Sequence, residues 1–487
     1  MRRPRRHEEE IRSMHDRMHE FTPEELLRLH DASMELLAST GVAFNEPEAL
    51  EIFEKHGKSV DGKVVRLTEA DVRAALETAP GRFVIHARNP EHDVAVGGDD
   101  FVLAPGYGAP FVATAEGVQR EATLEDYNRF CKLIQTSPYL DMNGFMMVEP
   151  SDVPSDTAHL DMLFSSIVLC DKAFMGAPVS RQGARDTLEM AGRIWGGTEA
   201  IRNKPVTISL INSLSPLQFS EEMAASLIEL ARYGQPCVVA ALIMAGSSGP
   251  VTQAGVLALQ NAEILAGITL AQLVNPGTPV VYGSTSSAMD MRSGGLSIGA
   301  PEYPMFVSAA AQMARFYGLP CRSGGALTDS HVPDAQAGME SALSLLTTVR
   351  NGVNFVLHSA GILGSYIAMS FEKFLLDEEL CGMVRKITSP VAVTDEAIDL
   401  PTIQQVGIGG QYLTQPKTFK LCRTEFFLPK LANRASHEGW KQAGGLDAAR
   451  RAARAVEERL ARYRKPDIDP AVERDLAAYV ETRKRGT

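Results

Sequence analysis

The sequence predicts an α/β protein built on a (β/α)8 TIM barrel, with an N-terminal helical cap and a C-terminal helical extension. Short apolar runs recur along the middle of the chain, mostly at intervals of about thirty to forty residues. Each run is followed by a segment of helical periodicity, which is typical of parallel strands joined by right-handed crossovers. Eight such units close into a barrel. An open doubly wound sheet is the alternative, but no G-x-G-x-x-G motif follows the first run.

The N-terminal region, residues 1–100, is predicted to be a helical cap. In Thr22–Gly41, Thr22 is the expected N-cap, Glu25 completes a capping box, and a glycine ends the helix. Two further helices are predicted over Glu46–His56 and Leu67–Pro80.

The barrel is predicted to occupy residues 101–389 and to form the catalytic domain. Its eight strands are predicted at Phe101–Ala104, Leu140–Val148, Ala173–Ala177, Pro205–Ile211, Cys237–Met244, Thr278–Gly283, Leu319–Ser323 and Val353–His358. The repeat stops after about Ile387. Residues 390–487 are predicted to be a helical extension, with a charged helix over Asp447–Tyr463.

Composition excludes several classes of protein. A net charge of −12 argues against a nucleic-acid-binding protein, which needs a basic surface. The most apolar segment, Val256–Val274, is interrupted by polar residues, so no membrane span is expected. Six scattered cysteines without a CxxC pair, and no H-x-H or H-E-x-x-H motif, favour a reduced, cytoplasmic protein without a metal site.

The reacting groups of such a barrel lie where strands end and loops begin. The loop Gly324–Gly338 is the richest in chemistry, and within it Asp329 and His331 are the candidate catalytic residues. The alternative for His331 is a solvated or helix-capping role. Asp334 is equally well explained as the N-cap of the following helix.

Aromatic residues make up only 7% of the chain, yet several fall at predicted strand ends. They are candidates for a cage around a cationic ligand, although ordinary packing is the alternative for each. A buried His358 bonded to a carbonyl and a solvated Glu149 are alternatives as well. The predicted substrate-binding residues are Tyr107, Asn143, Glu149, Phe174, Asn212, Tyr282, Gln336, His358 and Tyr366.

Glycines in the last two loops, at Gly324–Gly325 and Gly361–Gly364, offer another possibility, which is a phosphate cradle. Neither loop contains a lysine or arginine. An anionic substrate bound by these loops is therefore the less favoured reading.

Five segments resemble the trimethylamine methyltransferase family. They are GYGAPFV (Gly106–Val112), NPGTPVVYGSTSSAMDMRSGG (Asn275–Gly295), TDSHVPDAQAG (Thr328–Gly338), VGIGGQYL (Val406–Leu413) and TEFFLPKLANR (Thr424–Arg434). The resemblance extends over roughly residues 20–480, in the same order along the chain.

The resemblance implies a barrel that moves a methyl group from a methylated amine to the Co(I) of a separate corrinoid protein. The pyrrolysine of the trimethylamine enzymes falls at or next to His331, where this chain has only standard residues. The chain therefore resembles the branch without pyrrolysine, which demethylates quaternary amines such as glycine betaine. Because Asp334 replaces the glycine of a D-x-H-x-x-G motif, we expect the corrinoid on the partner and no cofactor on this chain. We also expect a homo-oligomer.

For the site, the resemblance implies that Tyr107, Phe174 and Tyr366, with Asn143 and Asn212, hold the ammonium group. His331 and Gln336 would then bind a distal carboxylate. Two alternatives remain open, namely a non-catalytic betaine-binding or regulatory barrel and an unrelated barrel enzyme with an anionic substrate.

Overall fold

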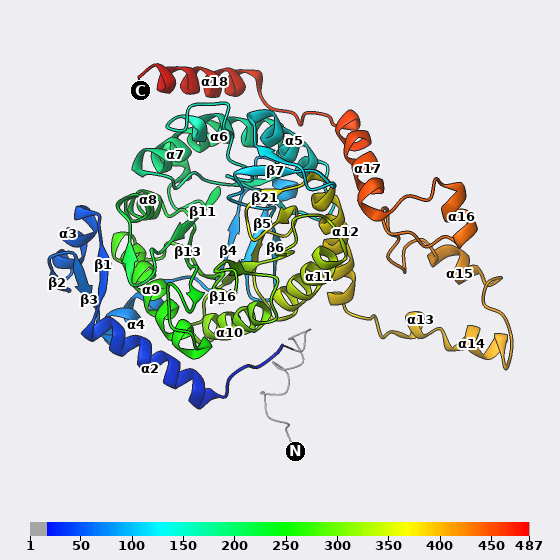
Figure 1. Cartoon of the computed structure of the whole chain (residues 1–487), viewed down its shortest axis with the longest axis horizontal. Helices are drawn as coiled ribbons and strands as arrows, with labels where there is room; N and C mark the ends of the chain where they lie inside the picture. Colours follow the sequence, from blue (N-terminus) through cyan, green and yellow to red (C-terminus); the bar gives the residue numbers. More distant parts are fainter. Residues whose placement is uncertain (1–16, 487) are drawn as a thin grey trace.

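The core of the protein is a parallel eight-stranded barrel, seen end-on in Figure 1. The computed structural model describes residues 17–486. Neighbouring strands pair in the order β6-β19-β18-β15-β13-β11-β10-β9. The strands are β6 (Val102–Leu103), β9 (Met142–Asn143), β10 (Ala173–Met175), β11 (Thr207–Asn212), β13 (Cys237–Ala241), β15 (Val280–Ser284), β18 (Cys321–Gly324) and β19 (Phe355–Leu357). Each overlaps its predicted run, and the predicted fold class is confirmed.

The barrel closes between β6 and β9 through one residue. The backbone N–H of Asp141 donates to the carbonyl of Leu103 at 2.9 Å, and the Asp141 carboxylate accepts from the Leu103 N–H at 2.7 Å. A side chain thus supplies one of the two hydrogen bonds at the seam.

A ring of helices covers the outside of the barrel (Figure 1). Serine, threonine and aspartate N-caps begin most of them. The ring contains α5 (Leu124–Gln135), α6 (Ala158–Leu169), α7 (Arg181–Trp195), α8 (Glu221–Arg232), α9 (Gln253–Val274), α10 (Glu302–Phe316), α11 (Ala335–Arg350) and α12 (Phe371–Thr388). Helix α9 is long and apolar enough to cross a membrane, but 89% of its most apolar window is buried in the barrel wall.

The N-terminal region contains the three predicted helices, α2 (Pro23–Ser39), α3 (Pro47–Lys55) and α4 (Glu69–Thr78), with the capping box at Thr22. The region is not purely helical, however. It also contains β1 (Val42–Phe44), β2 (Ser59–Asp61), β3 (Val64–Arg66) and the hairpin β4 (Arg82–Ile85)–β5 (Val94–Gly97). Strand β1 escaped prediction because it pairs with β12 (Gln218–Phe219), a distant segment, whereas β2–β3 and β4–β5 are short local pairs. The first sixteen residues of the predicted cap lie outside the described residues.

Two small sheets follow the carboxyl ends of the barrel strands and build the rim of the mouth. One contains β7 (Phe111–Ala113), β8 (Gln119–Glu121), β20 (Ile362–Leu363) and β21 (Ala368–Met369). The other contains β14 (Met244–Ala245), β16 (Ser287–Met289) and β17 (Leu296–Ser297).

The C-terminal region is helical, as predicted, and has two parts. Helix α17 (Ala448–Arg462) packs on α12 and α5, and α18 (Pro470–Arg485) packs on α6 and α7. Before them, α13 (Asp395–Ile398), α14 (Leu400–Val406) and α15 (Pro416–Leu421) project away from the barrel, and α16 (His437–Gln442) leads back (Figure 1).

Helix α18 is held on the barrel by a buried carboxylate of α7, Asp186. This carboxylate accepts hydrogen bonds from His159 at 2.9 Å, from the Tyr479 hydroxyl at 2.6 Å and from Arg483 Nε at 2.9 Å. Burial alone would raise the pKa of Asp186, but these hydrogen bonds lower it well below its ordinary value.

We expect Asp186→Asn to lower the free energy of unfolding by about 3 kcal/mol, because it leaves a buried network without its charge. The lowered pKa means that this stabilisation is present above pH ~4 and is lost as the pH falls further. Thermal unfolding at pH 7 and pH 3.5 measures both effects. Asp475→Asn, which removes the partly exposed ion pair to Arg193, is the control, and its effect should stay below about 1 kcal/mol. Equal effects of the two variants would contradict the assignment.

Candidate active site at the barrel mouth

An arginine, Arg322, occupies the interior of the barrel. In the register of the sheet it lies between Gly283 of β15 and Phe355 of β19. The side chains of its neighbours Cys321 and Ser323 face the other side of the sheet, where Ser323 contacts the Tyr303 hydroxyl of α10. Arg322 therefore points inward, since side chains alternate across a strand.

Small residues continue the inward-facing row of Arg322 on the next two strands. Gly283 pairs with Ala240, which pairs with Asn212. A Cβ added at Gly283 would lie 2.6 Å from the Ala240 Cβ. The barrel is therefore narrow here, and only glycine fits beside Ala240.

The Arg322 charge has no counter-ion among residues 17–486. The side chain is 1% exposed, and its Nη1 lies 3.3 Å from Thr285 Oγ1. Its Nη2 lies 3.5 Å from His358 Nδ1, and Nε has no hydrogen-bond partner. Burial lowers the pKa of Arg322, but an arginine stays protonated in proteins. Because buried charges are ordinarily paired, the arrangement fits a ligand that brings an anion.

His358 is neutral, and its tautomer follows from its contacts. Nε2–H donates to the Tyr107 carbonyl at 3.2 Å, which leaves Nδ1 to accept from Arg322. Burial lowers the pKa of His358 well below its ordinary value, and the Arg322 charge lowers it further.

Two tyrosines complete this cluster. The ring centroids of Tyr107 and Tyr366 lie 6.5 Å and 4.8 Å from that of His358. The Tyr366 hydroxyl is buried without a hydrogen-bond partner among the described residues. Burial raises the pKa of both phenols, so both are neutral. The mouth thus combines one buried cation, two neutral phenols and a neutral imidazole.

The loop after β19 is strained at the same place. His358, Ser365 and Tyr366 have φ values of 61°, 54° and 77°. Non-glycine residues in this region cost roughly 1–3 kcal/mol each, and such strain gathers at functional sites. The Ser365 hydroxyl donates to Asp329 at 2.6 Å, which helps to fix the loop.

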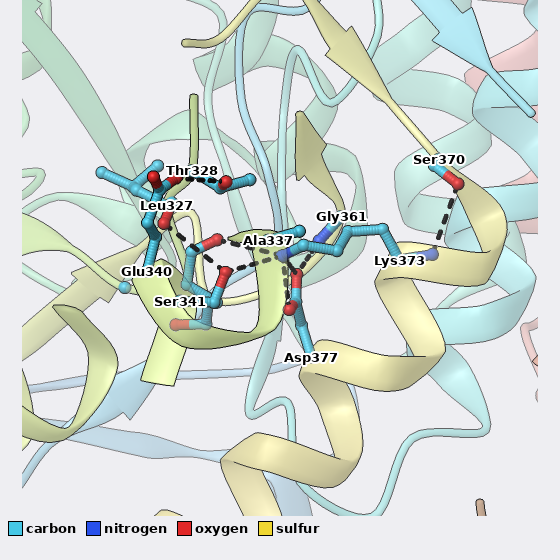
Figure 2. A network of polar contacts seen from close by, with 12 residues as sticks. Leu327, Thr328, Ala337, Glu340, Ser341, Gly361, Ser370, Lys373 and Asp377 are labelled. Atoms are coloured by element: carbon cyan, nitrogen blue, oxygen red, sulfur yellow. Dashed lines mark hydrogen bonds and ion pairs between the residues drawn. The ribbon is translucent and has the colours of Figure 1, made fainter. Parts of the chain in front are cut away.

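A buried ion pair on α12, Lys373–Asp377, contacts the loop that follows β19 (Figure 2). Lys373 Nζ contacts the two Asp377 oxygens at 2.5 and 2.6 Å and donates to the Ser341 hydroxyl of α11 at 2.8 Å. Asp377 also accepts from the Gly361 N–H at 2.9 Å. Burial raises the pKa of Asp377 to about 6 although Lys373 opposes this shift. The ion pair therefore joins α11 and α12 to the loop that follows β19.

The two predicted catalytic residues lie in the loop after β18. Asp329 accepts hydrogen bonds from the Ser297 hydroxyl, the Ile298 and Gly299 N–H groups and the Ser365 hydroxyl, at 2.6–3.0 Å. Its carboxylate is occupied in joining two rim loops. His331 is exposed, and a Cβ added at Gly364 would lie 2.8 Å from its Nδ1. Their catalytic role remains a prediction.

Three of the predicted binding residues face the outer helices instead of the interior. The Tyr282 hydroxyl donates to Asn261 of α9 at 3.1 Å, and Asn143 Nδ2 donates to Ser166 of α6 at 2.9 Å. Phe174 lies opposite Asn143 in register and shares its face. Asn143 ends β9, whereas Phe174 and Tyr282 lie in the middle of β10 and β15, and the alternation along each strand turns these side chains away from the mouth.

The remaining predicted residues lie around the rim. Asn212 belongs to the inward-facing row of Arg322 and is exposed, so the mouth is open on the β11 side. Gln336 and Glu149 are exposed, and Gln336 donates to Glu340 at 2.9 Å. The cluster that the structure does bring together is Tyr107, His358 and Tyr366. Arg322 was missed, although a charged residue within the apolar run Leu319–Gly325 is a signal that could have identified it.

Comparison with known proteins identifies the family of this chain. A model of the trimethylamine methyltransferase family, MTTB, matches residues 2–487. The chain belongs to the trimethylamine methyltransferase family. It is 46% identical to the glycine betaine methyltransferase of Desulfitobacterium hafniense (strain Y51), covering 95% of this chain and 96% of that protein. It is 34% identical to the proline betaine:corrinoid methyltransferase of Eubacterium limosum, covering 93% and 95%.

Relatives named for trimethylamine are less similar. The chain is 31% identical to the trimethylamine methyltransferase MttB of Desulfitobacterium hafniense (strain DSM 10664 / DCB-2), covering 95% of this chain and 93% of that protein. Among solved structures, the monomethylamine methyltransferase of Methanosarcina barkeri has a TM-score of 0.50 at 10% identity, covering 90% of this chain and 97% of that one. That likeness concerns the barrel fold alone. Within residues 17–486, no group of three or more His, Cys, Asp or Glu side chains is placed to hold a metal ion.

We expect His358 to remain an Nε2–H imidazole at pH 8 and well below pH ~6.5, because burial and Arg322 oppose its protonation. Two-dimensional 15N–1H NMR of histidine-labelled protein measures the tautomer, and His358→Asn identifies the signal. The lowered pKa also predicts that the unfolded chain binds more protons below pH ~6.5, so the free energy of unfolding decreases there. A His358 signal that titrates near pH 6.5 would contradict this prediction.

Proposed function

We propose that this protein is a corrinoid-dependent methyltransferase whose methyl donor is a betaine, a quaternary amine that also carries a carboxylate. The observation that carries the proposal is the buried Arg322 without a counter-ion. A betaine carboxylate would form the missing ion pair, and a guanidinium is well suited to hold it through two hydrogen bonds. Glycine betaine is the first candidate, because the relative at 46% identity is named for it.

The Arg322 charge also argues against a donor without a carboxylate. At ~5 Å and an effective dielectric constant of about 20, two positive charges repel by about 3 kcal/mol. Protonated trimethylamine and choline would both meet this repulsion. A betaine avoids it because its carboxylate lies between its ammonium group and Arg322.

The neutral aromatic groups suit the ammonium end of the substrate. Tyr107 and Tyr366 offer ring faces to a cation, and neutral His358 adds no charge. The nitrogen loses its positive charge as the methyl group leaves, so a carboxylate against it would stabilise the substrate more than the transition state. No acidic side chain forms an ion pair with this cluster among the described residues.

The chemistry requires no proton transfer. The C–N bond breaks, its electron pair stays on nitrogen, and a neutral tertiary amine leaves. The methyl group passes to the Co(I) of the corrinoid protein, which supplies the two electrons of the new bond. The tasks of this chain are to orient the ammonium group towards the mouth and to exclude water.

We propose that the corrinoid is carried by a separate cytoplasmic protein that docks on the open side of the mouth. Loops that follow β11, β13 and β15 expose four large apolar side chains there, at 38–69% of their full surface. They are Leu214, Leu242, Val251 and Met291. Apolar side chains grouped on a rim are typical of a docking surface.

The first experiment is a methyl-transfer assay with Co(I) cobalamin, and with Co(I) corrinoid protein, across glycine betaine, proline betaine, carnitine, choline and trimethylamine. We expect methyl-Co(III) absorbance only with donors that carry a carboxylate. Binding of betaines without turnover on either acceptor would favour a non-catalytic binding barrel. Turnover of trimethylamine or choline but not of betaines would contradict the proposal.

Arg322→Met should lower kcat/KM for glycine betaine at least about 30-fold, because losing a buried charge-assisted contact costs about 2 kcal/mol or more. Arg322→Lys keeps the positive charge but loses the two parallel N–H donors of the guanidinium, so it should recover only part of the lost kcat/KM. Arg73→Met on α4, which removes an exposed arginine paired with Glu69, is the matched control and should behave as wild type. An Arg322→Met enzyme that is folded by circular dichroism and still fully active on glycine betaine would exclude the assigned role.

Met291→Glu should lower methyl transfer to the corrinoid protein about tenfold or more, because it places a charge in an apolar contact. The transfer to free cobalamin should decrease far less, since small cobalamin does not need the docking surface. Leu27→Glu on α2, a similarly exposed apolar residue away from the mouth, controls for surface charge. Equal losses with both acceptors would place Met291 in the substrate site instead of the docking surface.

A further inference from the structure

A buried pair of opposite charges, Lys373 and Asp377 on α12, lies beside the loop after β19 but outside the ligand cluster. The two side chains are 2% and 4% exposed. Among residues 17–486, neither forms a hydrogen bond or ion pair with Arg322, His358 or Tyr366. Burying such a pair is costly, and an apolar pair of similar size often gives equal or higher stability. Stability alone therefore does not account for this pair.

The pair contacts two backbone segments that adjoin His358. Asp377 accepts a hydrogen bond at 2.9 Å from the N–H of Gly361, which follows His358 in the same loop. Lys373 Nζ lies 3.5 Å from the carbonyl of Ala326, and the Ala326 N–H donates to the His358 carbonyl at 2.9 Å. Figure 2 shows Lys373 and Gly361 meeting at the Asp377 carboxylate. The backbone of His358 therefore lies between two segments that the ion pair touches.

The Gly361 N–H is the group through which the pair acts on the loop. Gly361 has a φ of 100°, a conformation that favours glycine, and its carbonyl accepts from the Ser370 N–H at 2.9 Å. The turn lies between His358 and Tyr366, which also have positive φ values. Strained residues persist only where the surrounding structure fixes them. Without Asp377, the buried Gly361 N–H would lose its acceptor, and the turn would be free to relax.

Lys373 serves the same contact by holding the carboxylate in place. Its Nζ contacts both Asp377 oxygens, at 2.5 and 2.6 Å, and donates to the Ser341 hydroxyl of α11 at 2.8 Å. Without this cation, the buried carboxylate would be left with an unpaired charge or would take up a proton. Lys373 and Asp377 therefore act as one unit.

We propose that Lys373 and Asp377 are positioning residues for methyl transfer. They fix the Gly361 N–H, and through it the backbone that carries His358 and Tyr366, so that these two side chains stay aligned on the methyl donor. The pair itself touches neither the donor nor the corrinoid. This role rests on the proposed function, in which His358 and Tyr366 surround the ammonium group. A misplacement of about 1 Å at a reacting centre can lower a rate about 100-fold.

The test compares two double variants, Lys373→Met/Asp377→Leu and Lys373→Met/Asp377→Asn. Both remove the two charges together, so neither leaves a buried charge without its partner. They differ in one respect, because asparagine keeps a side-chain oxygen that can accept from the Gly361 N–H and leucine does not.

We expect the Met/Leu variant to lower kcat/KM for glycine betaine about tenfold or more, mainly through kcat, although circular dichroism shows a folded barrel. The Met/Asn variant should lose no more than about threefold, because the hydrogen bond to Gly361 is retained. If leucine at position 377 prevents folding, Lys373→Met/Asp377→Ala takes its place, since alanine also lacks the acceptor.

The 15N–1H signal of His358 gives a second measurement that needs neither methyl donor nor acceptor. We expect this signal to move in the Met/Leu variant and to stay close to its wild-type position in the Met/Asn variant. Asp186→Asn, which weakens a network between α7 and α18, is the control for stability. At a temperature where it is folded, it should keep both kcat/KM and the His358 signal.

A folded Met/Leu variant with wild-type kcat/KM and an unmoved His358 signal would overturn the positioning role. Equal losses in the two double variants would overturn it as well, because they would trace to the charges and not to the Gly361 acceptor. If wild type transfers no methyl group from any betaine, the proposed function fails and the His358 signal alone decides. A signal displaced only in the Met/Leu variant then supports the positioning of the loop, and one unmoved in both variants excludes it.

Discussion

The site is organised around one uncompensated charge, the Arg322 guanidinium inside the barrel. Gly283 lies beside it in register and pairs with Ala240, and a Cβ added at Gly283 would lie 2.6 Å from the Ala240 Cβ. Burial lowers the pKa of His358, and the Arg322 charge lowers it further, so the imidazole stays neutral. The strained loop after β19 brings His358 and Tyr366 to the same place. Much of what surrounds the mouth therefore follows from keeping a cation away from water without giving it an internal partner.

Four carboxylates differ from Arg322 because they have hydrogen-bond partners within the chain. Asp329, Asp377, Asp186 and Glu379 each accept several hydrogen bonds from within the chain. Asp329, Asp186 and Glu379 join elements that are distant in sequence, and Asp377 joins α12 to the loop that precedes it. Carboxylates with hydrogen-bond partners inside the chain hold this structure together. Arg322, which has no counter-ion among the described residues, is available for recognition. The contrast separates a structural from a functional role without reference to any relative.

The barrel was predictable because its signal is repeated and local. Each strand is a short apolar run bounded by small residues, and eight repetitions specify a closed sheet. The site was predicted only in part, because strand ends are easier to locate than the direction of a side chain. Tyr107, His358 and Tyr366 lie together, whereas the alternation along the strands turns Tyr282 and Asn143 outward. Arg322 lies within β18, so the rule that reacting groups follow the strand ends does not select it.

The pairing of β1 with β12 has a consequence for how the chain is made. Ala43 lies opposite Gln218, and Gln312 accepts from the Phe21 N–H at 3.0 Å, so the N-terminal region has its partners in the middle of the chain. At ribosomal speeds of about 5–20 residues per second, these partners emerge many seconds after the N-terminal helices. The apolar face of β1 therefore waits for β12, which follows the fourth barrel strand, and Phe21 waits for α10, which follows the sixth. During synthesis this region therefore acquires its partners only after the middle of the chain has been made.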